Sequence, residues 1–165
     1  YVKGFDVLMK AWGEIAKCCP GWKLRIVGAG DDSTIDMLKK KAGDAVDKVE
    51  FVSYTPYVRD EYLRAAVFVL SSRYEGWGLV MIEAMSQGCA VVACDYNGRQ
   101  AEAVSDGKNG LVCMPGNVEE LALKIKELIN NDSLRSILQN QGINSVAEYS
   151  EENVAINIEN IIRSI

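Results

Sequence analysis

Residues 71–93, together with the apolar run before them, constrain the fold more than any other part of the chain. The run Val67–Leu70 predicts a fully buried strand, and the apolar residues 90–93 predict a second one. Between them lie a polar loop, residues 71–78, and a short helix, residues 79–86, which ends before a glycine. This order of elements is typical of a parallel sheet, whose ligands bind at the carboxyl ends of the strands.

The loop and the helix carry two carboxylates with glycines between them. Glu75 lies in the loop and Glu83 lies in the helix, while Gly76 and Gly78 allow the backbone to approach a ligand closely. The free amides at a helix N-terminus beside a glycine loop favour an anion. A ligand with both phosphate and hydroxyl groups, such as a nucleotide sugar, fits this combination.

The remaining sequence alternates between strand and helix patterns. Its 165 residues fit one domain, and the alternation predicts an α/β fold, a doubly wound parallel sheet of the Rossmann type. Strands are expected at residues 23–27, 49–52 and 110–114, helices at residues 4–17, 34–41, 58–66, 118–130, 133–147 and 151–163, a loop at residues 95–98 and a helical turn at residues 100–104.

Composition excludes several classes of function. A net charge of -5 argues against nucleic acid as a partner, and no apolar run is long enough for a membrane span or a secretion signal. The chain has no histidine, which removes histidine triads and imidazole bases. Its five cysteines form no C-x-x-C pair, so we expect a reducing, cytoplasmic location, no structural metal, and Cys89, Cys94 and Cys113 as small buried residues.

Several motifs together resemble one family. The stretch E-G-W-G-L-V-M-I-E-A-M-S-Q-G-C-A-V-V-A resembles the E-x7-E stretch of the retaining glycosyltransferases of family 4, also called group 1. K-G-F-D-V-L, L-R-I-V-G-A-G, V-E-F-V-S-Y and D-G-K-N-G-L-V stand in that family's order. The resemblance covers nearly the whole chain. It implies that residues 1–165 are the C-terminal, donor-binding domain of a GT-B fold, without the N-terminal acceptor domain.

The resemblance assigns roles to three charged residues. It implies that Lys3 holds the donor diphosphate, that Glu75 faces the hydroxyls of the transferred sugar and stabilises charge at the anomeric carbon, and that Glu83 accepts hydrogen bonds from the ribose hydroxyls. Lys3 and Glu75 are thus the expected catalytic residues. From the residues alone, Lys3 is more simply a solvated terminal lysine. Glu75 could be a loop carboxylate in water and Glu83 a carboxylate that complements the helix dipole, but a functional role is the better interpretation of both.

The resemblance also implies a wider donor site. Gly28 lies at the nucleotide cleft, and Ser53 and Tyr54 meet the nucleobase, although Tyr54 is as readily a packing residue. Backbone amides complete the site at Gly76, Trp77, Gly78, Leu79 and Val80, with the Trp77 side chain expected to pack.

Other polar residues have less specific interpretations. We expect surface salt bridges for Arg73 and Arg99, and Glu102 fits the family's glycine-rich loop. Asp31 and Asp32 do not form a D-x-D pair, which favours a mechanism without metal or other cofactor.

One departure from the family concerns its first strand. Family 4 domains begin with a strand and an arginine before the K-G motif, which here is Lys3-Gly4. The first strand is central in a Rossmann sheet, so its loss exposes two strand edges. We therefore predict an apparently missing first strand, with a gap beside strands 23–27 and 67–70 that is either filled by a partner chain or otherwise compensated.

These expectations combine into a reaction. A sugar passes from a nucleoside diphosphate sugar to an acceptor hydroxyl with retention, the acceptor being a glycan or lipid bound by the absent domain, so this chain alone transfers little. Peripheral membrane association of the full-length protein is left open. The alternatives are a two-carboxylate hydrolase, a sugar-nucleotide epimerase, which relies on acid/base groups including histidine, and an inactive nucleotide-binding or interaction module.

Overall fold

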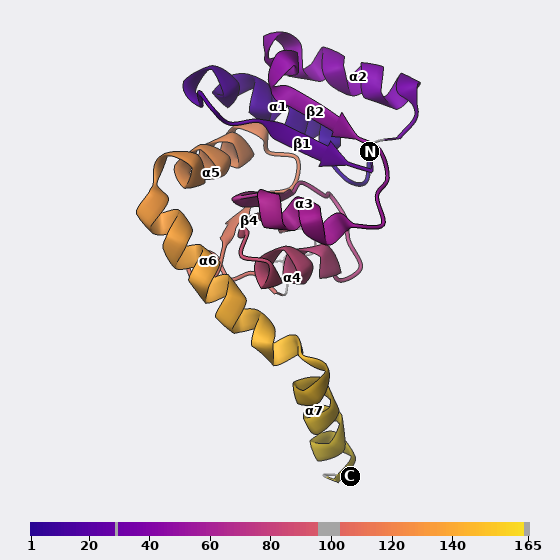
Figure 1. The fold of residues 1–165 in the computed structure, drawn as a ribbon, viewed down its shortest axis with the longest axis vertical. Helices are drawn as coiled ribbons and strands as arrows, with labels where there is room; N and C mark the ends of the chain where they lie inside the picture. Colours follow the sequence, from indigo (N-terminus) through magenta and orange to yellow (C-terminus); the bar gives the residue numbers. More distant parts are fainter. Residues whose placement is uncertain (29, 96–102, 164–165) are drawn as a thin grey trace.

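Short parallel strands form the centre of the molecule, which the computed structural model describes for residues 1–28, 30–95 and 103–163 (Figure 1). Within these residues, β1 (Leu24–Val27) pairs with β2 (Val49–Val52) in one sheet. A second sheet has the order β3 (Val67–Leu70), β4 (Ala90–Cys94) and β5 (Leu111–Cys113). All three pairings are parallel, as the alternation of strands and helices predicted.

Helices connect the strands at nearly the predicted residues. They are α1 (Phe5–Ile15), α2 (Asp32–Ala42), α3 (Val58–Arg64), α4 (Leu79–Ser86), α5 (Val118–Asn130), α6 (Asp132–Val146) and α7 (Glu151–Arg163), with 3-10 turns at Ala16–Cys18, Gly43–Lys48 and Ala147–Tyr149. The helix expected at residues 58–66 ends at Arg64, because Ala65 is already extended. Most of the loop and helical turn expected at residues 95–104 lies outside the described residues.

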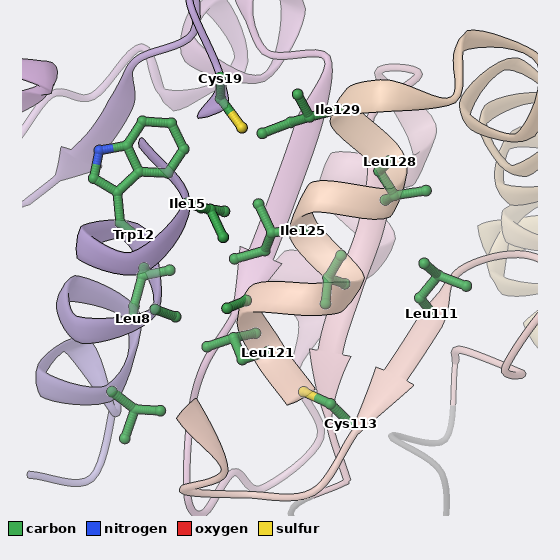
Figure 2. Close-up of a cluster of buried hydrophobic side chains, with 14 of the residues drawn as sticks. Leu8, Trp12, Ile15, Cys19, Leu111, Cys113, Leu121, Ile125, Leu128 and Ile129 are labelled. Atoms are coloured by element: carbon green, nitrogen blue, oxygen red, sulfur yellow. The ribbon is translucent and has the colours of Figure 1, made fainter. Parts of the chain in front are cut away.

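Both faces of the larger sheet are covered, which confirms the doubly wound α/β class. Every residue of β4 is buried, and successive side chains alternate between two apolar clusters. Ala90, Val92 and Cys94 join α1 and α5, whereas Val91 and Ala93 join α3 and α4. Figure 2 shows the first cluster, where Leu8, Trp12 and Ile15 of α1 lie opposite the stripe of α5. That stripe consists of Leu121, Ile125, Leu128 and Ile129, all buried.

The two sheets do not meet, so the predicted gap is confirmed. Within the described residues β1 pairs only with β2 and β3 only with β4. A cavity of about 870 Å³ lies between them, lined by the full length of β1 and β3 and floored by Leu8, Trp12, Ile125 and Ile129. No other strand of the described chain fills it. We call this space the inter-sheet slot.

The slot corrects one prediction from the sequence. Residues 67–70 were expected to be fully buried, but only Leu70 is, while Val67, Phe68 and Val69 are half-buried. Their strand is paired on one edge and borders the slot on the other. An apolar run predicts that a strand is covered on both sides. Here the edge of β3 that borders the inter-sheet slot is uncovered.

The C-terminal helix stands apart from this body. Figure 1 shows α7 extending beyond α6, away from both sheets. Ser150 caps its N-terminus, because the Ser150 Oγ accepts a hydrogen bond from the Asn153 amide at 3.3 Å. Val154, Ile156, Ile158 and Ile162 of α7 are exposed. In the described part of the chain, no helix has the length and apolarity that a membrane crossing requires.

Candidate functional site

An ion pair lies at the carboxyl end of β3, where the sequence predicted a site. Lys3 Nζ donates a hydrogen bond to Glu75 Oε1 at 2.7 Å, and Ser72 Oγ donates to the same oxygen at 2.6 Å. The Glu75 side chain is only 12% exposed, so it is not the carboxylate in water of the alternative interpretation. Among the described residues no group donates a hydrogen bond to its other oxygen, Oε2.

Gly4 brings Lys3 to this position. Its φ is +64°, in the left-handed region, and a Cβ on Gly4 would overlap with the carbonyl oxygen of Ser71. The close approach is held by two hydrogen bonds, from Ser71 Oγ to the Lys3 carbonyl at 2.9 Å and from the Arg73 amide to the Val2 carbonyl at 2.9 Å. The start of the chain therefore lies against the loop that carries Glu75.

Arg73 connects the same loop to α1. Its guanidinium donates to both carboxylate oxygens of Asp6, at 2.7 and 2.8 Å, and lies 4.4 Å from the ring centre of Tyr1. The expected salt bridge is confirmed, although its partners are only 21% and 27% exposed. Hydrogen bonding from Arg73 lowers the pKa of the Asp6 carboxyl. The bidentate pair joins the first turn of α1 to the loop.

The N-terminus of α4 lies beyond Glu75. Gly78 is its N-cap with φ +70°, and the Met81 amide donates to the Gly78 carbonyl at 2.9 Å. Within the described residues the amides of Leu79 and Val80 have no partner, as is usual in a first turn. Gly76 is exposed and borders open space, and Leu79 is exposed. Trp77 packs edge-on against Tyr149, with ring centres 5.3 Å apart, as expected for a packing side chain. This turn presents backbone amides to solvent beside the ion pair.

Glu83 lies one turn further along α4. It is exposed, and its Oε2 accepts a hydrogen bond from the Tyr62 hydroxyl at 3.1 Å. Glu83 is the fifth residue of the helix, and the first turn has no acidic residue. The interaction with the helix dipole falls off beyond the first turn, so it does not account for this carboxylate.

The predicted residues only partly share one cavity. Lys3, Gly28 and Val80 line the inter-sheet slot, whereas Glu75 and Glu83 do not. Ser72 and Tyr62, which the sequence did not predict, line it as well. Each glutamate instead contacts a residue of the slot wall, Lys3 for one and Tyr62 for the other. The two carboxylates are thus connected through the slot wall and make no direct contact.

The predicted nucleobase segment follows β2. Gly28 has φ +75° and its amide donates to the Val52 carbonyl at 3.0 Å, which aligns the ends of β1 and β2. Ser53 is exposed and Tyr54 is 83% exposed, so the interpretation of Tyr54 as a packing residue is wrong.

Several other predicted residues take no part in this geometry. Arg99 and Glu102 lie outside the described residues. Asp31 caps α2 by accepting a hydrogen bond from the Thr34 amide at 2.8 Å, which lowers the pKa of its carboxyl. In the described ranges no group of three metal-ligating side chains comes together.

The sequence interpretation missed three supporting residues. Ser71 and Ser72 are buried polar residues that hold Lys3 and Glu75, and Tyr62 holds Glu83. Two serines directly after an apolar strand were the available signal for the first pair, because a buried hydroxyl needs a partner. Nothing in the spacing of Tyr62 and Glu83 indicates their contact, since it joins two helices.

Known proteins resemble this chain in both sequence and fold. The family model described as glycosyl transferases group 1 matches residues 1–145. An uncharacterized glycosyltransferase of Haemophilus influenzae is 35% identical over 154 residues, covering 88% of this chain and 44% of that protein.

Solved structures agree. A variant of S. aureus TarM, in complex with Fondaparinux, alpha-GlcNAc-glycerol and UDP, superposes with a TM-score of 0.85 at 29% identity, over 97% of this chain and 33% of TarM. The C-terminal domain of a group 1 glycosyl transferase family protein (LpcC) from Francisella tularensis gives 0.81 at 26% identity, over 91% of this chain and 81% of that domain. The fold is that of GT-B glycosyltransferase domains. The chain spans less than half of its H. influenzae relative, and it belongs to the group 1 glycosyl transferases.

Proposed function

We propose that this chain is the donor-binding domain of a retaining glycosyltransferase that uses a nucleoside diphosphate sugar. The observation that carries the proposal is the pairing of Lys3 with Glu75 at 2.7 Å beside the free amides of α4. One spot thus offers a cation and N–H donors for a diphosphate, and a carboxylate for sugar hydroxyls. UDP in the TarM complex supports a nucleotide donor.

The cation and the amides act on the leaving group. Negative charge builds on the diphosphate as the glycosidic bond breaks, and donors already aimed at it stabilise the transition state. Lys3 is 60% exposed, so its ammonium reaches from Glu75 to a bound diphosphate without leaving a buried site. Glu75 keeps Oε1 on Ser72 and offers Oε2 to the transferred sugar.

The sugar is transferred with retention of configuration. The acceptor hydroxyl attacks the anomeric carbon from the face that the diphosphate leaves, as the resemblance to family 4 implies. Glu75, largely shielded from water, stabilises the positive charge that develops on the sugar. A hydrolase with two cooperating carboxylates fits less well, because Glu83 contacts Tyr62 on another helix and Glu75 contacts Lys3.

The acceptor belongs to a part of the protein beyond this chain. The LpcC structure, which is a C-terminal domain by itself, supports the same assignment here. A glycan or lipid acceptor would then bind to an N-terminal domain across the cleft. The alternative, an inactive nucleotide-binding module, keeps the donor site and lacks turnover in any context.

Calorimetry with UDP, GDP and ADP tests the donor site. We expect one of these nucleotides to bind, and Lys3→Ala or Glu83→Ala to weaken that binding by about 10- to 100-fold, as expected for hydrogen bonds to charged groups. Glu127→Ala is the control, because Glu127 is exposed on α5 away from the site. The absence of binding to all three nucleotides, or equal binding by Glu83→Ala and the unaltered protein, would contradict the proposal.

A further inference from the structure

Tyr62 and Glu83 form a contact between α3 and α4 whose two members differ sharply in exposure. Tyr62 is 8% exposed and Glu83 is exposed, and the phenol donates to Glu83 Oε2 at 3.1 Å. We propose that Tyr62 is a positioning residue that holds Glu83 so that Oε1 accepts hydrogen bonds from the ribose hydroxyls of the donor nucleotide. This inference rests on the proposed function and adds a residue to its site.

The phenol is rigidly placed. Its ring packs edge-on against Phe68 of β3, with centres 5.7 Å apart at 75°. The Tyr62 carbonyl accepts a hydrogen bond from Cys89 Sγ at 3.3 Å, just before β4. Tyr62 is therefore held by contacts with the sheet. It can hold the Glu83 carboxylate in one orientation more firmly than an exposed, mobile side chain could.

The helix that carries Tyr62 is also anchored on both sides. Arg25 of β1 pairs with Glu61 at 2.8 Å, and Arg59 Nε donates to Gln87 Oε1, just past the end of α4, at 3.0 Å. These contacts fix α3 relative to both the slot and α4. The relative placement of Tyr62 and Glu83 thus depends on more than their own hydrogen bond.

Glu83 needs such support because the described residues give its carboxylate no other hydrogen bond. In the described part of the chain, the Tyr62 hydroxyl is the side-chain donor to its carboxylate, and Oε1 accepts nothing. A free glutamate samples several rotamers, and binding must then order it. With Oε2 held, Oε1 is already oriented when the ribose arrives.

The protonation state suits this role. Burial and the neighbouring Glu83 carboxylate both raise the pKa of Tyr62, so the phenol remains a donor throughout the ordinary pH range. The arrangement repeats that of Glu75, where Ser72 occupies one oxygen and leaves the other open. In both cases a buried hydroxyl holds the carboxylate and the ligand receives the opposite oxygen.

A purely structural role is the competing explanation, because a buried phenol generally requires a hydrogen-bond partner. Tyr62→Phe separates the two roles, since it keeps the packed ring and removes only the hydroxyl. Tyr57→Phe is the matched control, because it makes the same chemical change at a tyrosine that is 72% exposed. Calorimetry would use UDP, GDP or ADP, whichever binds, and its 2′,3′-dideoxy analogue.

We expect Tyr62→Phe to weaken binding of the ribose nucleotide by about three- to tenfold and to leave binding of the dideoxy analogue unchanged. The loss is smaller than that from Glu83→Ala, because the carboxylate stays and only its orientation is lost. Tyr57→Phe should change neither. In the Glu83→Ala background, Tyr62→Phe should cost nothing further. Thermal unfolding of both variants would be recorded in parallel, because a structural role changes the melting temperature without distinguishing the two nucleotides.

Three results would overturn the inference. Unchanged ribose-nucleotide binding by Tyr62→Phe, while Glu83→Ala weakens it, removes the positioning role and leaves the proposed function intact. An equal loss for both nucleotides shows a structural effect of the hydroxyl. A failure of the unaltered protein to bind any of the three nucleotides overturns the proposed function and this inference together.

Discussion

Gly4 is the residue whose small size matters most directly for the candidate site. It combines a positive φ with a backbone approach to Ser71 that leaves no room for a side chain. Lys3 reaches Glu75 only because the next residue passes this close to the loop. A lysine and a glycine are common at the start of a helix. The reason for a glycine at position 4 is therefore its close approach to Ser71, and not the helix start itself.

Gly4→Ala should therefore damage stability and the site together. Alanine pays for the left-handed conformation, about 1–2 kcal/mol, and its Cβ also collides with the Ser71 carbonyl, so we expect a total loss above about 3 kcal/mol. Gly107→Ala is the control, because Gly107 has φ +72° with no atom within 4 Å of an added Cβ. Urea unfolding measures both, and equal losses in the two variants would show that the approach to Ser71 carries no cost.

At the scale of single residues, the sequence identified the candidate carboxylates but not the side chains that hydrogen-bond to them. The position of Glu75 after an apolar strand led us to predict a ligand-facing carboxylate, and that role stays a prediction; its low exposure contradicts only the interpretation as a carboxylate in water. The hydroxyls of Ser72 and Tyr62 could not be assigned, because hydrogen bonds between separate elements leave no periodic pattern in the chain. For Tyr54 the sequence did not decide between packing and exposure, and the structure shows that its side chain is exposed.

At the scale of elements, the inter-sheet slot dominates the structure. β1 and β3 each have a parallel partner on one edge, and each presents its other edge to a cavity with an apolar floor. An open edge of this kind is ready to accept a further strand. The Val2 carbonyl accepts a hydrogen bond from the Arg73 amide, so the first residues lie just past the carboxyl end of β3.

Amide hydrogen exchange tests whether the slot is open. We expect the amides of β1 and β3 that face the slot to exchange much faster than those of β4, which is paired on both edges. An extended apolar peptide of about five to six residues, the usual strand length, should slow that exchange when added in excess. Protection of β3 equal to that of β4 in the chain alone would show that the slot is already closed.

The elements themselves were largely predictable, and for a physical reason. The bounds of β2, α4, α5 and α7 match those expected, because local apolar periodicity and turn residues specify each of them. The prediction that β3 is fully buried was wrong. The burial of a strand depends on the elements that pack beside it, and the sequence of the strand does not reveal them. The gap itself was predicted only through the family's missing strand, since no pattern within residues 1–165 indicates it.

At the scale of the whole molecule, the candidate site is a surface rather than an enclosed active site. Ser53, Tyr54, Gly76, Leu79 and Glu83 are all exposed around the carboxyl ends of the strands. Catalysis of transfer needs an acceptor hydroxyl held at the anomeric carbon and water kept away from it. Within the described residues nothing covers this face, and the chain spans 44% of its H. influenzae relative.

We therefore expect the isolated chain to bind donor nucleotide and to transfer sugar very slowly. Without a positioned acceptor the reaction loses the advantage of proximity, which is worth at least about a thousandfold in rate. The measurement is transfer from radiolabelled UDP-glucose to glycerol, together with release of free glucose, with Glu83→Ala as the control for the site. Turnover of this chain alone near 10 per second, the median for enzymes, would show instead that it already contains a complete active site.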